Sequence, residues 1–265
     1  MNSKYKVFKF IKNKFENTDD FISIEEPLEI SLKYKDQDKW ETLILSITMR
    51  TPNHDKDLVR GFLFNEQMIQ SLNEIKEIES IGNKVGQYDI QNRILITLNN
   101  SKNIDISKIK RDFITNSSCG VCGKSSLDAL EVIKKEKVSN SNPKLSKETV
   151  IKSPSILRDN QSEFSKTGGI HASGLFSSDG KLISLREDVG RHNALDKMIG
   201  NALYKNQINP QNQFITCSGR LNFELVQKVL MTDISLMIGV GAPTSLAIDL
   251  ANRFDMTLIG FVKED

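Results

Sequence analysis

Hydrophobic and polar residues alternate in several stretches of the first hundred residues, as they do in strands that bury one face. Residues 24–50 contain two such stretches, IEEPLEISLKY and ETLILSITMR, and two more occur near 76–81 and in YDIQNRILITL. The residues that follow the first pair, Thr51-Pro52-Asn53-His54-Asp55, form a helix-start signal, and a helix is predicted through LVRGFLFNEQMI. This part of the chain is therefore expected to form an antiparallel sheet with one buried face and one helix.

The second half of the chain has a different pattern, in which short apolar runs alternate with segments of helical period. A helix is predicted near 147–164, followed by strands GIHASGLF and KLISLR that are joined by a hairpin turn at 177–180. A helix is predicted from about 191 to 204, and strands QFITCS, SLMIGV and MTLIGFV then alternate with helices LNFELVQKVLMT and APTSLAIDLANRF. A hairpin followed by alternating strands and helices predicts a three-layer α/β domain whose mixed sheet is covered on both faces.

Between these halves, residues 113–126 (FITNSSCGVCGKSS) are rich in Ser, Asn and Gly and predict a loop. A helix is predicted at SLDALEVIKKEK, and the polar stretch KVSNSNPKLSKE is the best candidate for a linker. We therefore expect an N-terminal strand-rich lobe at residues 1–115 and an α/β domain at residues 116–265 that begins with the cysteine-containing loop. The first residues, MNSKYKVFKFIKNKF, predict a frayed tail, with a weakly amphipathic surface helix as the alternative.

The composition limits the classes of partner and the compartment. Hydrophobic residues make up 38% of the 265 residues, which is enough for a core, and a net charge of +2 provides no overall field that would attract nucleic acid. No apolar run approaches the roughly 20 residues that span a bilayer, and the first residues lack the features of a secretory signal. Three cysteines do not make a disulfide framework, so the sequence predicts a cytoplasmic protein without a membrane or nucleic-acid partner.

The cysteine pair in Cys119-Gly120-Val121-Cys122-Gly123 is the sharpest local signal, and three kinds of chemistry use this spacing. A zinc site needs a second pair of ligands, and the one other cysteine and three histidines supply no pair at zinc spacing. A thioredoxin-like redox pair should open a helix directly after a strand, which this loop does not do. A persulfide carrier needs an exposed thiolate on a segment that can swing between a sulfur donor and an acceptor, and a Ser- and Gly-rich loop provides one.

A second candidate site lies in the polar run from residue 187 to residue 193, EDVGRHN, between a predicted strand and a predicted helix. Such a junction offers free backbone N–H groups and the positive end of the helix dipole to a phosphate or to a ring edge. Asp188 could simply cap the helix, but capping gives no reason for Arg191 and His192 beside it. We expect Arg191, His192 and Asn193 to contact a ligand.

Two further strand–helix junctions carry polar residues of the same kind. Ser218-Gly219-Arg220 places Arg220 where it can meet an anion, and Ala242-Pro243-Thr244-Ser245 contributes the hydroxyls of Thr244 and Ser245. In a largely parallel sheet these junctions would cluster with residues 187–193 at the carboxyl ends of the strands, where ligands bind. His171, which follows a Gly168-Gly169 pair, is open to two interpretations, a satisfied core histidine and a functional one.

At this point the chain resembles the FdhD family of formate dehydrogenase accessory sulfurtransferases. The matching segments occur in family order: MRTPNHDKDLVRGFLFNEQMI (49–69), SSCGVCGK (117–124), TGGIHASGLF (167–176), REDVGRHNALDKMIGNAL (186–203), CSGRLNFELVQKV (217–229) and GAPTSLAIDLA (241–251). The resemblance implies that sulfur from a cysteine desulfurase is held as a cysteine persulfide. It also implies that the sulfur passes to the molybdenum bis(guanine dinucleotide) cofactor, a bound substrate, before this cofactor enters apo formate dehydrogenase.

The resemblance also assigns roles to residues of this sequence. Cys119 and Cys122 match the sulfur-relay pair, and Cys119 matches the persulfide-bearing position. Local chemistry alone does not choose between them, because Cys122 is nearer to the following helix start, which favours its thiolate. The family's cofactor-binding segment matches Gly260-Phe261-Val262-Lys263-Glu264-Asp265. Most relatives continue past this point, so the part that this segment plays in cofactor binding here is left open.

The resemblance further implies that the larger domain is similar to the cytidine-deaminase fold, which raises the alternative of a zinc deaminase. Such enzymes need H-x-E at one helix start and P-C-x-x-C at the next. The corresponding places are His192-Asn193-Ala194 and Cys217-Ser218-Gly219-Arg220, which lack the acid/base glutamate and one cysteine. Zinc cannot activate water without them, so we expect no metal site.

The sequence as a whole predicts a sulfurtransferase, with a non-catalytic chaperone of the molybdenum cofactor as the alternative. The expected partners are a cysteine desulfurase, apo formate dehydrogenase and the guanine-nucleotide moiety of the cofactor. A symmetric homodimer is expected, partly from the family and partly because two-fold assemblies are the commonest. Replacing Arg191 or Arg220 by Ala is expected to weaken guanine nucleotide binding by roughly tenfold or more.

Overall fold

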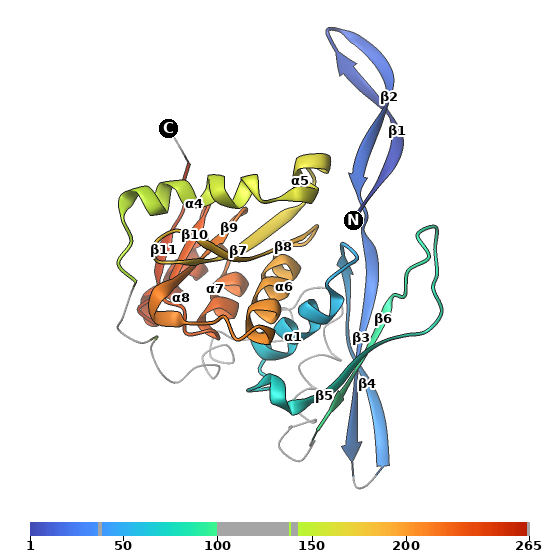
Figure 1. Ribbon diagram of the computed structural model, residues 1–265, viewed down its shortest axis with the longest axis vertical. Coiled ribbons are helices and arrows are strands. Elements are labelled where there is room, and N and C mark those ends of the chain that lie inside the picture. Colours follow the sequence, from blue (N-terminus) through green and yellow to red (C-terminus); the bar gives the residue numbers. More distant parts are fainter. Residues whose placement is uncertain (37–38, 100–137, 139–142, 264–265) are drawn as a thin grey trace.

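The computed structural model describes residues 1–36, 39–99, 138 and 143–263, which form three β-sheets and the helices that cover them (Figure 1). The first sheet is an antiparallel ribbon of β1 (Asn2–Ile11) and β2 (Lys14–Ser23). Lys12 and Asn13 join its strands with φ angles of 49° and 64°, the left-handed pair that a tight hairpin turn requires. The predicted frayed tail and its helical alternative are therefore both wrong.

The second sheet has four strands in the order β4-β3-β6-β5. Its elements are β3 (Glu26–Asp36), β4 (Lys39–Arg50), β5 (Ile75–Ile81) and β6 (Arg93–Leu98). The predicted strands are present, but β6 runs parallel to β3, so the sheet is mixed rather than antiparallel. Leu28, Ile30, Leu32 and Tyr34 alternate along β3 and are buried on one face of the sheet, where α1 (Asp55–Asn65) packs.

The helix α1 ends earlier than its periodicity predicted. It stops at Asn65 instead of continuing through Ile69, because Gln67 takes a left-handed φ of 57° and the Met68 N–H turns back to the Leu63 carbonyl. The chain then enters a short 3₁₀ turn, η1 (Leu72–Glu74), that Ser71 and Glu74 cap reciprocally before β5 begins.

The third sheet has five strands in the order β11-β10-β9-β7-β8. Its elements are β7 (His171–Ser177), β8 (Leu182–Asp188), β9 (Gln213–Cys217), β10 (Leu236–Gly239) and β11 (Thr257–Ile259). The helices are α4 (Lys147–Asp159), α5 (Ser162–Thr167), α6 (Arg191–Tyr204), α7 (Phe223–Leu230) and α8 (Ser245–Arg253), with the 3₁₀ turn η3 (Pro210–Asn212) before β9. The hairpin, strands and helices predicted after residue 146 are confirmed, except that the helix predicted at 147–164 is two helices with a break at Asn160 and Gln161. The loop predicted at 113–126 and the helix predicted at SLDALEVIKKEK lie outside the described residues.

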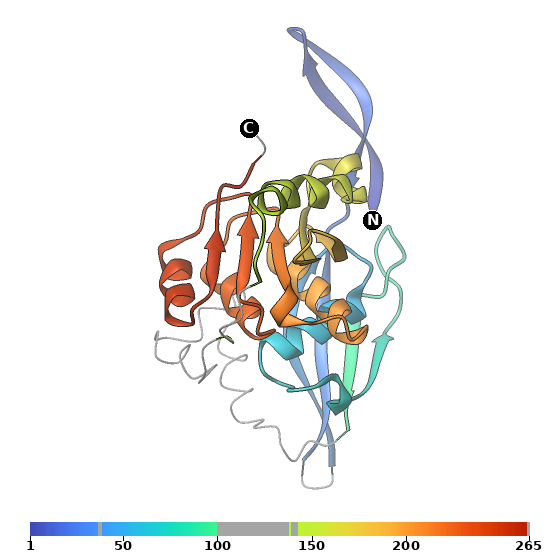
Figure 2. The same cartoon turned by 60° about the vertical axis from the view of Figure 1, so that its left-hand side comes forward.

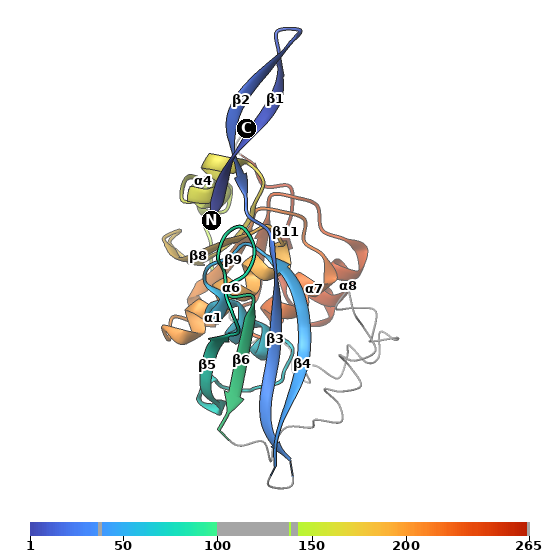
Figure 3. The same cartoon turned by 90° about the vertical axis from the view of Figure 1, so that its right-hand side faces the viewer.

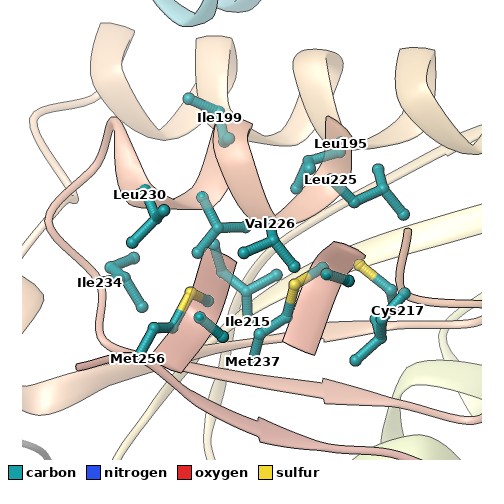
Figure 4. Packing of buried hydrophobic residues seen from close by; sticks show 14 of the residues in the cluster. Leu195, Ile199, Ile215, Cys217, Leu225, Val226, Leu230, Ile234, Met237 and Met256 are labelled. Carbon is teal, nitrogen blue, oxygen red and sulfur yellow. The ribbon is translucent and has the colours of Figure 1, made fainter. Parts of the chain in front are cut away.

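Apolar residues on the two faces of this sheet belong to two different cores, as a three-layer domain requires. Ile215 and Met237 face α6, α7 and α8, whereas Phe214, Leu236 and Ile238 face α4 on the other side. Figure 2 shows the helices on either side of the sheet, and Figure 4 shows the larger core, in which Ile215 and Met237 meet Leu195 and Val226. The α/β class and the mixed sheet are therefore confirmed, and residue 115, where the lobes were expected to divide, lies outside the described residues.

The four-stranded and five-stranded sheets are joined by close packing of α1 on α6. A Cβ at Gly61 would lie 1.9 Å from the Asp196 carbonyl oxygen, and a Cβ at Gly200 would lie 2.0 Å from the Asp57 carbonyl oxygen. Only glycine permits this approach of the two backbones. None of the helices in the described residues is long and apolar enough to cross a membrane.

Candidate functional site

The strand directions bring the predicted junctions to one edge of the five-stranded sheet. β9, β10 and β11 are parallel, and β8 points the same way because β7 is antiparallel to both β8 and β9. The carboxyl ends of four strands and the start of β7 therefore lie together, as the pattern of junctions predicted. Backbone hydrogen bonds connect the loops, from Gly241 N–H to the Gly219 carbonyl (3.1 Å) and from Phe261 N–H to the Gly241 carbonyl (3.2 Å).

A cavity of about 640 Å³ opens at this edge, between the ends of the strands and the α4–α5 break. Apolar groups form most of its wall, and a few polar groups converge on it, which is the usual make-up of a small-molecule site. Its lining includes Leu157, Arg158, Gln161, Phe164, Ile170, His171, Val189, Ser218, Val240, Val262 and Lys263. His171 begins β7, is partly buried and contributes to this wall.

The β8–α6 junction is held by a buried ion pair rather than by a helix cap. Gly190, not Asp188, precedes the first turn of α6. Asp188 is fully buried with its carboxylate 2.6 Å from Lys197 Nζ, and it accepts hydrogen bonds from Thr51 N–H (3.2 Å) and Gly190 N–H (2.9 Å). Burial raises the pKa of the Asp188 carboxyl, while the Lys197 ammonium and these hydrogen bonds act to lower that pKa. The pair therefore fixes the turn that presents Arg191 and His192.

His192 and Arg191 differ in how far their side chains are already engaged. His192 Nε2 lies 2.7 Å from a Glu224 carboxylate oxygen and 3.0 Å from Asn222 Nδ2, so the first turns of α6 and α7 are linked. The hydrogen bond from His192 lowers the pKa of Glu224. Arg191 Nε is buried and has no hydrogen-bond partner among the described residues. Burial, and next the charge of Arg191, lower the pKa of His171. Arg191 follows Val189, a residue of the cavity wall, by two positions.

Arg191 and His192 do not line the cavity, and neither do the other ligand residues predicted at the helix starts. Asn193 donates its amide to the Met49 carbonyl (2.8 Å) and to Thr48 Oγ1 (3.2 Å), so it joins α6 to β4. Arg220 was expected next to a helix start, but the Asn222 side chain caps α7 and the helix begins only at Phe223. Arg220 is exposed, and so are the two hydroxyl residues at the start of α8, Thr244 and Ser245; none of the three lines the cavity.

The chain's last described residues follow β11 along the same edge. Gly260 packs against Pro243, Phe261 is exposed, and Val262 donates its N–H to the Gly239 carbonyl at 3.2 Å. Val262 and Lys263 line the cavity, so two residues of the predicted cofactor segment reach it. Cys119, Cys122, Glu264 and Asp265 lie outside the described residues.

The third cysteine, Cys217, is unsuited to sulfur chemistry in the folded protein. Its thiol is buried beside Ser173 at 3.4 Å, and burial raises its pKa to about 11. A thiol in this state carries almost no thiolate at neutral pH. The described residues also contain no cluster of three or more His, Cys, Asp and Glu side chains that could hold a metal.

Sequence reasoning missed three residues that the α4–α5 break brings to the cavity. The Arg158 guanidinium lies over the Phe164 ring, 3.4 Å from its centroid. Gln161 is only 2% exposed, and its Nε2 has no hydrogen-bond partner in the described part of the chain. The polar run Arg158-Asp159-Asn160-Gln161 was the available signal of a break within the single helix predicted near 147–164.

Comparison with known proteins places the chain in a family. The FdhD/NarQ family model matches residues 24–265. The sulfur carrier protein FdhD of Sulfolobus acidocaldarius is 39% identical over 260 residues, covering 98% of this chain and 92% of its own. That of Streptomyces coelicolor is 38% identical over 246 residues, covering 92% and 84%. A crystal structure from Desulfotalea psychrophila, described as a formate dehydrogenase accessory protein, shares the fold with a TM-score of 0.71 at 23% identity, covering 98% of this chain and 92% of its own. This protein therefore belongs to the FdhD/NarQ family, together with relatives that are named sulfur carriers.

Proposed function

We propose that this protein takes persulfide sulfur from a cysteine desulfurase and transfers it to the molybdenum bis(guanine dinucleotide) cofactor destined for formate dehydrogenase. The family membership and the cysteine pair of the sequence support sulfur transfer. The observation that carries the cofactor part is the cavity at the carboxyl edge of the five-stranded sheet, where Lys263 lies on the wall and Arg191 follows the wall residue Val189 by two positions.

The cavity has the size and lining that a guanine base needs. Its volume of about 640 Å³ lies within the usual range of small-molecule sites, roughly 300–1,000 Å³. The free amide of Gln161 can donate to the ring carbonyl of guanine, and leaving this buried donor unmatched costs about 1–3 kcal/mol. Phe164, with Arg158 over its ring, provides a flat apolar surface beside it.

The phosphates of the nucleotide require positive charge, which the near-neutral chain must supply locally. At the start of α6, Arg191 carries a buried Nε that has no partner among the described residues, and its guanidinium and the helix dipole act in the same direction. Lys263 is exposed on the cavity wall. In this arrangement the base occupies the cavity and the phosphates lie between these two cations.

Sulfur handling is assigned to the cysteine pair. Cys119 bears the persulfide and Cys122 serves as its partner, as the resemblance implies, whereas buried Cys217 takes no part. The test is mass spectrometry of the protein after incubation with a cysteine desulfurase and cysteine, with Cys119→Ser, Cys122→Ser and the control Cys217→Ser. The expected result is one added sulfur atom that Cys119→Ser abolishes and Cys217→Ser retains. Absence of added sulfur on both loop cysteines, with nucleotide binding intact, would establish the non-catalytic cofactor chaperone instead.

The nucleotide site is tested by calorimetry with GDP. Arg191→Ala and Gln161→Leu should each weaken GDP binding about tenfold or more, since each removes a buried donor. Arg220→Ala is the matched control, because Arg220 is exposed whereas the Arg191 Nε is buried. All three variants should load persulfide normally, because loading requires only the thiolate and the desulfurase. Equal GDP affinity in the wild type, Arg191→Ala and Gln161→Leu would remove the site from this cavity.

A further inference from the structure

His171 is a residue of the cavity wall whose ring nitrogens are not used within the described fold. It begins β7, is half-buried and lines the cavity. Neither ring nitrogen makes a hydrogen bond to another of the described residues. A neutral imidazole carries one hydrogen-bond donor and one acceptor, and polar groups that are buried without a partner cost free energy. The ring is therefore available to a molecule that enters the cavity.

The loop between β9 and α7 fixes the position of this ring. Ser218 Oγ accepts a hydrogen bond from the Ala172 N–H at 2.9 Å, and the Ser218 N–H donates to the Ala172 carbonyl at 3.0 Å. The ring of His171 packs on Gly219, where a Cβ would lie 3.3 Å from Nδ1 and 3.4 Å from Cε1. Since Nδ1 faces the backbone at Gly219, Nε2 is the nitrogen that is left for a ligand.

Gln161 supplies a second unmatched polar group on the same wall, from a different layer of the domain. Its Nε2 is buried and has no partner in the described part of the chain. α4 lies against β7, β8 and β9 (Figures 1 and 3), so the turn that follows α4 brings Gln161 to the cavity that His171 lines. The Gln161 amide donates and a neutral imidazole nitrogen can accept, so a ligand that satisfies both carries an acceptor and a donor. Guanine carries them side by side, because its O6 carbonyl stands next to its N1–H and 2-amino groups.

The surroundings of His171 keep its ring uncharged at neutral pH. Burial lowers the pKa of His171 most, and the charge of Arg191 lowers that pKa further. Asp188 acts to raise the pKa of His171, but the Asp188 carboxylate is already paired with Lys197 at 2.6 Å. The charged and titratable side chains around the ring are Arg191 and His192 of α6, Asp188 of β8, and Arg158 and Lys263 of the cavity wall. Most of them are cations or become cations on protonation, so His171 stays neutral and keeps an acceptor.

We propose that His171 is a specificity-determining residue of the cavity, which accepts a hydrogen bond at Nε2 from the N1–H or 2-amino edge of guanine while Gln161 donates to O6. The role of His171 rests on the nucleotide site proposed above and adds to that site the acceptor that selects the base. Adenine has an acceptor at N1 and no 2-amino group, so it offers Nε2 no donor at this edge. Recognition of guanine therefore depends on an uncharged ring at position 171.

The test is the affinity for GDP and for ADP, measured by calorimetry at neutral pH, of the full chain and three variants. His171→Phe keeps a flat ring without nitrogens, so it should weaken GDP binding about tenfold or more and change ADP binding by less than about twofold. His171→Gln places an amide oxygen near the position of Nε2, so it should keep GDP affinity within about threefold of the wild type. The matched control is His54→Gln, because His54 is exposed at the start of α1 and does not line the cavity.

The pH profile of GDP binding separates a ligand contact from a structural role. A protonated imidazole donates from both nitrogens and cannot accept, so acid should weaken the wild type but not His171→Gln. The ratio of the wild-type affinity to the His171→Gln affinity should fall about tenfold or more as pH decreases below the ordinary histidine pKa of about 6.5. The titration of the GDP phosphates is common to both proteins and cancels in this ratio. His54→Gln should follow the wild type throughout.

The outcomes distinguish the role of His171 from the nucleotide site itself. GDP binding that is weakened by Gln161→Leu but unchanged by His171→Phe would overturn the role of His171 alone. An affinity ratio that rises in acid would also overturn it, because a protonated ring would then be contacting a phosphate. If neither Gln161→Leu nor His171→Phe weakens GDP binding, the cavity is not the nucleotide site and both proposals fail. Circular dichroism checks the folding of His171→Phe, and if that variant does not fold, the ratio of wild type to His171→Gln decides.

Discussion

Lys197 neutralises Asp188 inside the protein, so replacing Lys197 by Met should strongly destabilise the folded state. Both side chains are fully buried, and Lys197 Nζ contacts the Asp188 carboxylate at 2.6 Å and the Thr51 carbonyl at 2.7 Å. Removal of one partner from a buried ion pair leaves an uncompensated charge and costs about 3–5 kcal/mol. Since domains are stable by only about 5–15 kcal/mol, Lys197→Met should move the urea midpoint strongly downward without changing the slope.

The same variant should show a characteristic pH dependence. Burial already raises the pKa of Asp188, and the Lys197 ammonium is the largest influence that lowers it. Without this ammonium the pKa of Asp188 rises further, so the folded state binds a proton more tightly than the unfolded state. Stability then falls as pH rises from the unfolded carboxyl pKa to the folded pKa. The deficit of Lys197→Met relative to wild type should therefore be smaller at mildly acidic pH than at neutral pH.

The double variant Asp188→Asn/Lys197→Met supplies the control for this reasoning. It removes both charges, so it should be more stable at neutral pH than Lys197→Met alone, and its deficit should not vary across the same pH interval. Urea unfolding followed by circular dichroism at both pH values measures all three proteins. A Lys197→Met deficit below about 1 kcal/mol at neutral pH would refute the claim that this pair is energetically coupled.

Three further predictions concern packing and reactivity. Gly61→Ala and Gly200→Ala should each lower the free energy of unfolding, measured in urea, by about 3 kcal/mol or more, because the new Cβ would overlap the facing backbone. Gly168→Ala is the control: its Cβ would meet open space, so this variant tests the effect on the backbone alone. Cys217 should resist iodoacetamide in the folded protein at mildly alkaline pH and react once urea unfolds it, since its pKa is about 11; rapid labelling of the native protein would contradict its burial. His192→Asn should raise the pKa of Glu224, measured by NMR titration of the carboxyl groups. The lowered pKa of Glu224 in the wild type stabilises the folded state only above the pKa that this carboxyl has in the unfolded chain. The loss of stability in His192→Asn should therefore vanish as pH falls through the folded-state pKa of Glu224.

Much of the α/β domain could be predicted because its local signals agree with its tertiary structure. The helix predicted from 191 to 204 matches α6, Arg191–Tyr204, and the turn at 177–180 joins β7 to β8. The convergence of the 187–193, 218–220 and 242–245 junctions also followed from the alternation of strands and helices. The side chains that enter the cavity could not be predicted from this alternation, because it indicates where the loops lie but not the direction in which each side chain points. Arg220 illustrates this limit, since the Asn222 cap delays α7 and leaves the arginine exposed.

The parts that escaped prediction depend on contacts between distant segments. Gln161 faces the cavity only because α4 stops at Asp159 and the Glu187 carboxylate accepts the N–H groups of Glu163 and Phe164, which sets α5 in place. A single sequence gives no sign that residues 24 apart will meet in this way. The β1–β2 ribbon was missed for a related reason: β1 alternates lysines with aromatic residues, and a tail with no visible core to bury them favours disorder. The ribbon is held at its base by contacts with Glu163 and Thr167, so α5, which contributes Phe164 to the wall of the proposed nucleotide cavity, also fixes the start of the chain.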